Sequence, residues 1–66
     1  MNLTVNGEPR TFQSACDVAG LVAELGLDAR KVAVELNLEI VPRSAYGRTP
    51  LAEGDRIEIV HFIGGG

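Results

Sequence analysis

The chain contains a single cysteine, Cys16, among 66 residues, and this limits how so short a sequence can fold. Small domains often depend on disulfides or a structural metal, but one cysteine cannot form an intramolecular disulfide. The only histidine, His61, is distant in sequence, and no CxxC or HxxxH spacing indicates a zinc site. The fold must therefore rest on its core, and a hydrophobic content of 45% is typical of one globular domain.

Alternating apolar and polar residues predict several β-strands. Residues 2–5 alternate, and Asn6-Gly7 then favours a two-residue hairpin because both residues tolerate positive φ. Residues 8–13 would form the returning strand, with Phe12 as its apolar anchor. Further strands are predicted at residues 31–36, 39–41 and 56–63, of which the last is the strongest.

One amphipathic helix is predicted from about residue 15 to residue 25. Ser14 and Asp17 have the spacing of a capping box, which would start the helix at Ser14. Gly26 suits the left-handed residue that closes a helix. Cys16 would then lie in the first turn, where we expect a small buried side chain rather than a reactive thiol. The apolar face follows i, i+3, i+4, i+7 spacing and consists of Val18, Leu21, Val22 and Leu25.

A hairpin, one helix and three later strands predict an α+β domain, a small mixed sheet of four to five strands packed on one main helix. Residues 43–50 have the composition of a loop with room for one helical turn, and we expect Tyr46, Arg43 and Arg48 there to be solvated. Leu51 would close the core from this side. The predicted core consists of Leu3, Val5, Val18, Leu21, Leu25, Val34, Leu36, Ile57 and Ile59.

Charge and composition argue against several classes of partner. The chain carries 6 Lys and Arg residues against 9 Asp and Glu residues, a net charge of −3. Nucleic-acid binding needs a basic patch, so we expect no nucleic-acid partner. No apolar run approaches the roughly 18 residues of a membrane span, so we expect no membrane association. Residues 1–5 lack signal-peptide features, and a lone cysteine without an export signal favours the reducing cytoplasm.

The sequence offers no credible active site, so we expect a protein on which other enzymes act. A single histidine, His61, placed in a strand does not make a Ser-His-Asp set, and no GxxxxGK loop is present to bind phosphate. A 66-residue domain also leaves little room for a closed pocket around a pair of carboxylates. We predict neither catalytic residues nor a metal site of the chain's own.

Three glycines, Gly64, Gly65 and Gly66, follow the strongest predicted strand. Glycine loses more backbone entropy on ordering than any other residue, so this run cannot serve to hold the fold. We therefore expect a folded domain over residues 1–63 and a flexible tail over residues 64–66. A tail without β-carbons can enter a narrow channel and present a carboxylate to another protein's active site. A frayed end is the alternative interpretation.

The last predicted strand has two faces, because side chains alternate along a strand. One face carries Ile57, Ile59 and His61, and the other carries Glu58, Val60 and Phe62. If the first face meets the helix, Val60 and Phe62 look outward beside the tail. Either a neighbouring loop partly covers them, or they form a docking patch for partner enzymes. Glu58 would help to steer a basic partner surface, although a charged strand also discourages aggregation.

Two segments resemble the ThiS family of thiamine sulfur carriers, which belongs to the ubiquitin-like β-grasp carriers. The first is VAVELNLEIVPR, from Val32 to Arg43, and the second is GDRIEIVHFIGGG, from Gly54 to Gly66. The resemblance covers essentially the whole chain, and the Gly-Gly ending is shared by carriers of this class. It implies a β-grasp fold.

The resemblance also implies that the chain is a protein co-substrate rather than an enzyme. An E1-like adenylyltransferase, ThiF, would use ATP and Mg²⁺ to adenylate the carboxylate of Gly66. A cysteine desulfurase would pass sulfur through a persulfide to give a thiocarboxylate, and thiazole synthase, ThiG, would take that sulfur. Gly65 and Gly66 carry over as functional positions, while some relatives have another residue at the place of Gly64.

Two alternatives remain from the sequence. One is a sulfur carrier of a related pathway, such as molybdopterin synthesis or another thiolation. The other is a ubiquitin-like interaction module without a carrier role, whose tail is either inert or joined to lysines.

Overall fold

The computed structural model describes residues 1–62, which form five strands, one α-helix and two 3₁₀ helices. The strands are β1 (Asn2–Val5), β2 (Glu8–Thr11), β3 (Val32–Leu36), β4 (Glu39–Val41) and β5 (Arg56–His61). The helices are α1 (Val18–Glu24) and the 3₁₀ helices η1 (Ala29–Lys31) and η2 (Arg43–Arg48).

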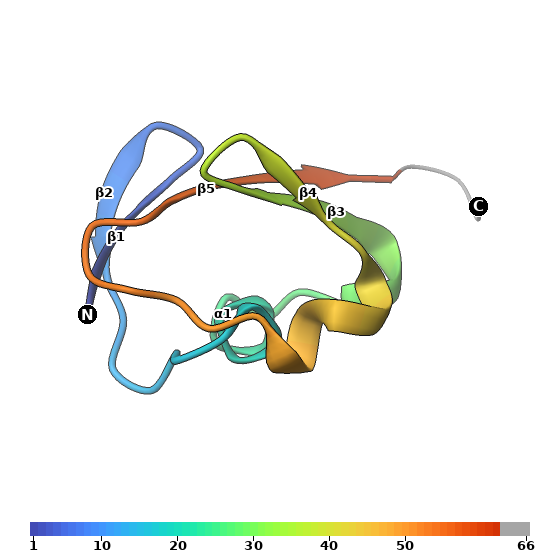
Figure 1. Ribbon diagram of the computed structural model, residues 1–66, viewed down its shortest axis with the longest axis horizontal. Coiled ribbons are helices and arrows are strands. Elements are labelled where there is room, and N and C mark those ends of the chain that lie inside the picture. The colour runs from blue at the N-terminus through green and yellow to red at the C-terminus, as the bar shows by residue number, and fades with distance from the viewer. Residues whose placement is uncertain (63–66) are drawn as a thin grey trace.

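The five strands form one mixed sheet in the order β2-β1-β5-β3-β4. β1 and β5 are parallel, and the other neighbouring pairs are antiparallel. Figure 1 shows the sheet as one layer with α1 and η2 against one of its faces, while no described element covers the other face. The prediction of an α+β, β-grasp domain with a small mixed sheet on one main helix is confirmed.

Both hairpins turn through two residues with positive φ, which matches the right-handed twist of the flanking strands. Asn6 and Gly7 have φ values of 51° and 82°, so the predicted first hairpin is confirmed. The second turn, between β3 and β4, uses Asn37 at 50° and Leu38 at 73°. A leucine is unusual at such an angle, and its exposed side chain lies at the tip of the hairpin.

The predicted start of the helix is wrong by three residues. α1 begins after Asp17, whose Oδ1 accepts a hydrogen bond from the Gly20 N–H at 2.7 Å. The chain before Asp17 cannot coil because it pairs with a distant segment: the Leu51 N–H donates to the Cys16 carbonyl oxygen at 3.0 Å. Ser14 is therefore not the cap, and Cys16 is exposed rather than buried in a first helical turn.

The predicted end of the helix is confirmed. Gly26 has a φ of 75°, and its N–H donates to the Ala23 carbonyl oxygen at 2.9 Å. The Leu27 N–H donates to the Val22 carbonyl oxygen at 3.0 Å. These two bonds form a Schellman motif, which satisfies carbonyl groups that the helix leaves without partners.

The core lies between α1, η2 and the covered face of the sheet. Six of the nine residues predicted for it are buried, and Leu25, Leu36 and Ile59 are partly buried against it. Leu51 is buried as expected. The buried residues are Leu3, Val5, Phe12, Ala15, Val18, Leu21, Val22, Val32, Val34, Val41, Tyr46, Leu51 and Ile57.

The expectation of a solvated Tyr46 is wrong, because the ring is only 4% exposed. The turns of η2 bring the ring into the core, and its hydroxyl donates to the Val32 carbonyl oxygen at 3.1 Å. That bond removes the cost of burying the hydroxyl group. Arg43 and Arg48 are exposed, as expected.

Candidate functional site

The last strand of the described residues, β5, is the central strand of the sheet. β5 lies between β1 and β3; β1 pairs with it as far as Ile57, and β3 pairs with it as far as His61. On the β3 side, the Phe62 N–H donates to the Lys31 carbonyl oxygen at 2.8 Å, one residue beyond the end of β5. Figure 1 shows the end of β5 on the side of the sheet away from the N-terminus. The described chain is therefore held by backbone hydrogen bonding as far as Phe62.

Gly64, Gly65 and Gly66, the positions predicted for tail access and covalent modification, lie outside the described residues. The same holds for Ile63 and for the predicted boundary between domain and tail. Their roles stay predictions.

Val60 and Phe62 lie on the uncovered face of the sheet, at 62% and 51% exposure. Their outward orientation agrees with the predicted alternation along β5. Glu58 shares this face and is also exposed. The strand register adds Ile40 of β4, 76% exposed, because it stands opposite Glu35 of β3, which stands opposite Glu58. We call the set Glu35, Ile40, Glu58, Val60 and Phe62 the outer patch.

The outer patch combines apolar side chains with two carboxylates. Glu35 and Glu58 face each other directly across β3 and β5, an arrangement that costs stability through charge repulsion. Within residues 1–62 the ion pair is Arg30 with Asp28, at 3.0 Å, so neither glutamate has an ion-pair partner there. A surface of this kind fits a partner that brings apolar side chains and a basic group.

Sequence reasoning missed Ile40 and Glu35 as members of this face. Each lies in a predicted strand, and alternation alone gives each one of two faces. The choice between the faces requires the register between strands that are distant in the sequence. The sequence offers no signal for this choice, because Ile40 and Val41 are adjacent and both apolar; the burial of Val41 in the structure shows that Ile40 points the other way.

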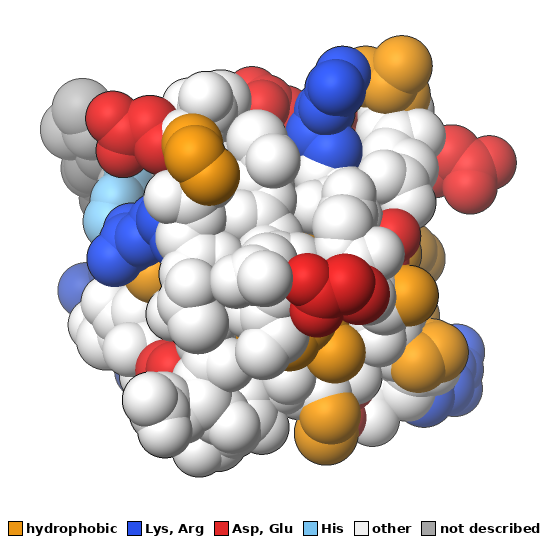
Figure 2. Space-filling view, turned by 90° about the vertical axis from the view of Figure 1, so that its left-hand side faces the viewer, with side chains coloured by type: hydrophobic (Ala, Val, Ile, Leu, Met, Phe, Trp, Pro, Cys, Tyr) orange, Lys and Arg blue, Asp and Glu red, His pale blue; other side chains and the backbone are white. Residues whose placement is uncertain are grey.

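The side of the molecule turned to the viewer in Figure 2 presents a different surface. Its hydrophobic side chains emerge in small separate areas among acidic, basic and other atoms. This side offers no continuous apolar area comparable to a docking face.

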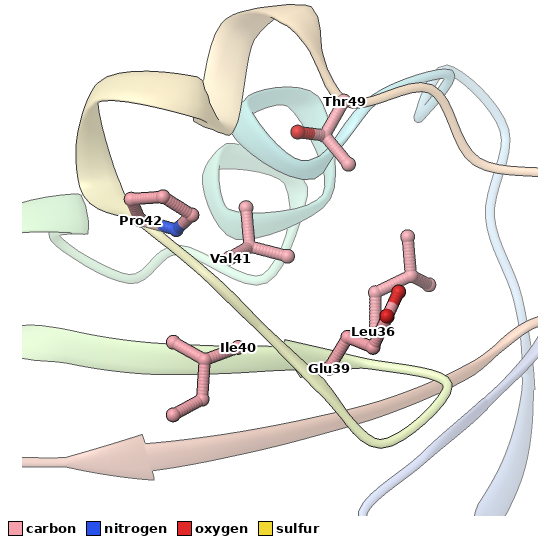
Figure 3. A pocket seen from close by; sticks show the side chains of 6 residues that line it. All are labelled: Leu36, Glu39, Ile40, Val41, Pro42 and Thr49. Carbon is pink, nitrogen blue, oxygen red and sulfur yellow. The ribbon is translucent and has the colours of Figure 1, made fainter.

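A pocket of about 200 Å³ lies between β4 and η2, lined by Leu36, Glu39, Ile40, Val41, Pro42 and Thr49. In Figure 3, Leu36, Val41 and Thr49 point toward its interior, and Ile40 points away from it. Its volume is below the roughly 300–1,000 Å³ of small-molecule sites. Glu39 is its only ionisable side chain, so it lacks the paired groups of an acid–base centre.

Two carboxyl groups, those of Glu24 and Asp28, have lowered pKa values, and both bind loop backbone rather than the end of β5. The backbone N–H groups of Gln13 and Ser14 donate to Glu24, and the first of these is the main cause of its lowered pKa. The Arg30 side chain, by hydrogen bonding, lowers the pKa of Asp28 to about 2. Both carboxylates hold loop backbone in place, which is a structural role.

Two further features are absent from residues 1–62. No group of three His, Cys, Asp or Glu side chains in that range is arranged to hold a metal ion. No helix in that range combines the length and the apolar character needed to cross a membrane.

Comparison with known proteins gives close relatives over the whole chain. A thiazole synthase from Paramagnetospirillum magneticum is 56% identical over all 66 residues, and this chain spans 20% of the length of that relative. The sulfur carrier protein ThiS from Bacillus subtilis is 43% identical over 49 residues, or 74% of each chain.

A solved structure agrees with these sequence relatives. The crystal structure of the thiamine biosynthesis protein ThiS from Geobacter metallireducens has a TM-score of 0.84 and 43% identity, with 100% of both chains covered. Residues 3–66 match the sequence profile of the ThiS family, so the match includes the terminal glycines. This chain belongs to the ThiS family.

Proposed function

We propose that the chain is a sulfur carrier of thiamine biosynthesis and that the carboxylate of Gly66 carries the sulfur. The observation that carries this proposal is membership of the ThiS family over residues 3–66. The names of the relatives from Bacillus subtilis and Geobacter metallireducens support it. In this role the chain is a co-substrate and binds no cofactor itself.

The proposed reaction starts on an E1-like, ThiF-type enzyme that holds ATP and Mg²⁺. A carboxylate oxygen of Gly66 attacks the α-phosphate of ATP, the bond to the β-phosphate breaks, and pyrophosphate leaves. The terminal sulfur of a persulfide, supplied by a cysteine desulfurase, then attacks the acyl carbon and AMP leaves. A thiol next attacks the sulfur–sulfur bond of the acyl disulfide, which releases the Gly66 thiocarboxylate and a new disulfide.

The outer patch would dock the partner enzymes. Val60, Phe62 and Glu58 precede the glycines closely in the sequence and lie on a face that the described part of the chain leaves uncovered. An enzyme that binds this face at β5 would have its active site within reach of the glycines that follow in the sequence. Gly64 and Gly65 would pass through a narrow channel, because they have no side chain that could clash with its walls.

Thiazole synthase is the proposed acceptor of the sulfur. The Paramagnetospirillum magneticum relative is a thiazole synthase of which this chain spans 20%. A matching segment within that enzyme's own polypeptide supports a direct encounter between carrier and synthase, since tethering raises the effective concentration of two partners.

Sulfur transfer to thiazole synthase tests this function. The thiocarboxylated chain is mixed with a ThiG-type synthase and its other substrates, and the mass of the carrier is followed alongside thiazole formation. We expect the carrier to return to the carboxylate as thiazole phosphate appears. If the sulfur stays on this chain while the Bacillus subtilis carrier is consumed, the chain serves another thiolation pathway.

A further inference from the structure

The two sides of β5 are supported unequally near the tail. β3 pairs with β5 from Ile57 as far as His61. β1 pairs with β5 only as far as Ile57, because the chain turns away at Asn6. On the β1 side, Glu58 and Ile59 thus have no opposite residue in a strand.

The side chain of Asn6 takes the place of the missing strand. Its Oδ1 accepts a hydrogen bond from the Ile59 N–H at 2.7 Å, and its Nδ2 donates to the Ile59 carbonyl oxygen at 3.2 Å. Its backbone N–H donates to the Ile57 carbonyl oxygen at 2.9 Å, so the side chain extends the ladder by one step. A primary amide provides the same donor and acceptor as a peptide group and can make both bonds at once.

We propose that Asn6 is a positioning residue that fixes the base of the glycine tail for activation of the Gly66 carboxylate. This inference rests on the proposed carrier function. The Asn6 side chain holds Ile59 from the β1 side, and the Lys31 carbonyl holds Phe62 from the β3 side. Misplacing reacting atoms by about 1 Å can cost a reaction on the order of a hundredfold in rate. Loosening one of two anchors at the base of so short a tail therefore affects the reaction step.

Asn37 provides a matched control. It is the first residue of the other hairpin turn and has a φ of 50°, against 51° for Asn6. Its side chain also makes two hydrogen bonds beside β5, accepting from the Arg56 N–H at 3.0 Å and donating to Asp55 Oδ1 at 3.1 Å. Those bonds lie at the start of β5, away from the tail. Glycine tolerates positive φ, so Asn→Gly at either position keeps the turn and removes two bonds.

The experiment compares Asn6→Gly with Asn37→Gly as substrates of the E1-like adenylating enzyme, with ATP and Mg²⁺, by pyrophosphate release. For Asn6→Gly we expect kcat to fall roughly tenfold while KM changes little, because the outer patch is intact. Asn37→Gly should keep the wild-type kcat even where its thermal melt falls by the same amount. Asn6→Asp keeps the acceptor but lacks the donor, and its kcat should lie between those of the wild type and Asn6→Gly.

Amide hydrogen exchange of the free proteins gives a second readout. Ile59 and Phe62 should exchange faster in Asn6→Gly than in Asn37→Gly, because only the former loses the bonds at the end of β5.

Several results would overturn the inference. A wild-type kcat for Asn6→Gly would show that Asn6 has no positioning role, and the proposed carrier function would be unaffected. An equal loss of kcat in both glycine variants would assign the effect to stability alone. If Asn6→Gly did not fold, a wild-type kcat in Asn6→Asp would decide against the role. Failure of the wild-type chain to be adenylated would remove the proposed function and this inference together.

Discussion

Tyr46 is a single residue whose surroundings reverse the interpretation of its sequence. The neighbouring Arg, Ser, Gly and Thr residues are typical of a solvated loop. The 3₁₀ helix η2 nevertheless places the ring in the core, where the Val32 carbonyl oxygen accepts from its hydroxyl. Sequence patterns of period two or 3.6 do not describe so short a 3₁₀ segment, and for that reason the burial was missed.

Replacing Tyr46 by phenylalanine should destabilise the fold by about 1–2 kcal/mol, since the Val32 carbonyl loses a buried donor. Adenylation should be unaffected, because the ring lies on the covered side of the sheet. The free energy of unfolding from urea titrations measures the loss. An unchanged urea midpoint would mean that the hydroxyl contributes nothing to stability.

Asp28 makes stability depend on pH. The hydrogen bond from the Arg30 side chain is the main cause that lowers its pKa from 3.8 to about 2. Because folding lowers this pKa, the stabilisation is present above pH 3.8 and is lost as the pH falls toward about 2. Asp28→Asn should therefore lose less stability than the wild type across that range. Urea midpoints of both proteins at several pH values measure how steeply the stability of each depends on pH. An equal pH dependence in the wild type and Asp28→Asn would show that Asp28 is not the responsible group.

Helix α1 shows which parts of an element the sequence can define. Its C-terminal end was predictable because Gly26 follows directly on the last apolar position and closes the helix locally. Its N-terminal end was not, because Ser14 and Asp17 are both acceptable N-caps. The pairing of Cys16 with Leu51 decides between them, and that contact joins segments that are distant in the sequence.

The position of the cap predicts different outcomes for two similar substitutions. Asp17→Ala removes the acceptor of the Gly20 N–H and should cost about 0.5–2 kcal/mol of folding free energy. Ser14→Ala should cost much less, since the Ser14 side chain caps nothing. Thermal melts of the two variants measure the difference. A larger loss for Ser14→Ala would restore the capping box as the start of the helix.

The predicted site shows the same division between local and distant information. Alternation along β5 placed Val60 and Phe62 on one face, with an outward direction if Ile57 faces the helix, and the burial of Ile57 meets that condition. Ile40 and Glu35 join the outer patch only through the register of β4 and β5 on β3. No periodicity within a single segment contains that register.

At the scale of the whole molecule, the sheet has one covered and one uncovered face among the described residues, and β5 is its central strand. The covered face supplies the stability, and the uncovered face is available for partners. This separation predicts that function and folding can be altered independently.

Phe62→Glu tests that separation. The side chain is half exposed, so the thermal melt should be nearly unchanged. Docking should weaken, with KM for adenylation rising roughly tenfold, or about 1.4 kcal/mol. Ala23→Glu is the control, because it adds the same charge at an exposed position of α1, on the opposite side of the molecule. A collapse of the melt in Phe62→Glu would make Phe62 a core residue instead.

The central claim, that the Gly66 carboxylate accepts sulfur, is tested most directly by mass. The chain is incubated with the adenylating enzyme, ATP, Mg²⁺ and a persulfide donor, beside a variant that lacks Gly66. Removing one residue moves the carboxylate by roughly 3.3–3.6 Å along an extended chain, which is far enough to prevent attack on the α-phosphate. We predict a gain of one sulfur minus one oxygen, in the C-terminal peptide of the full chain only. Equal sulfuration of the shortened variant would contradict the account.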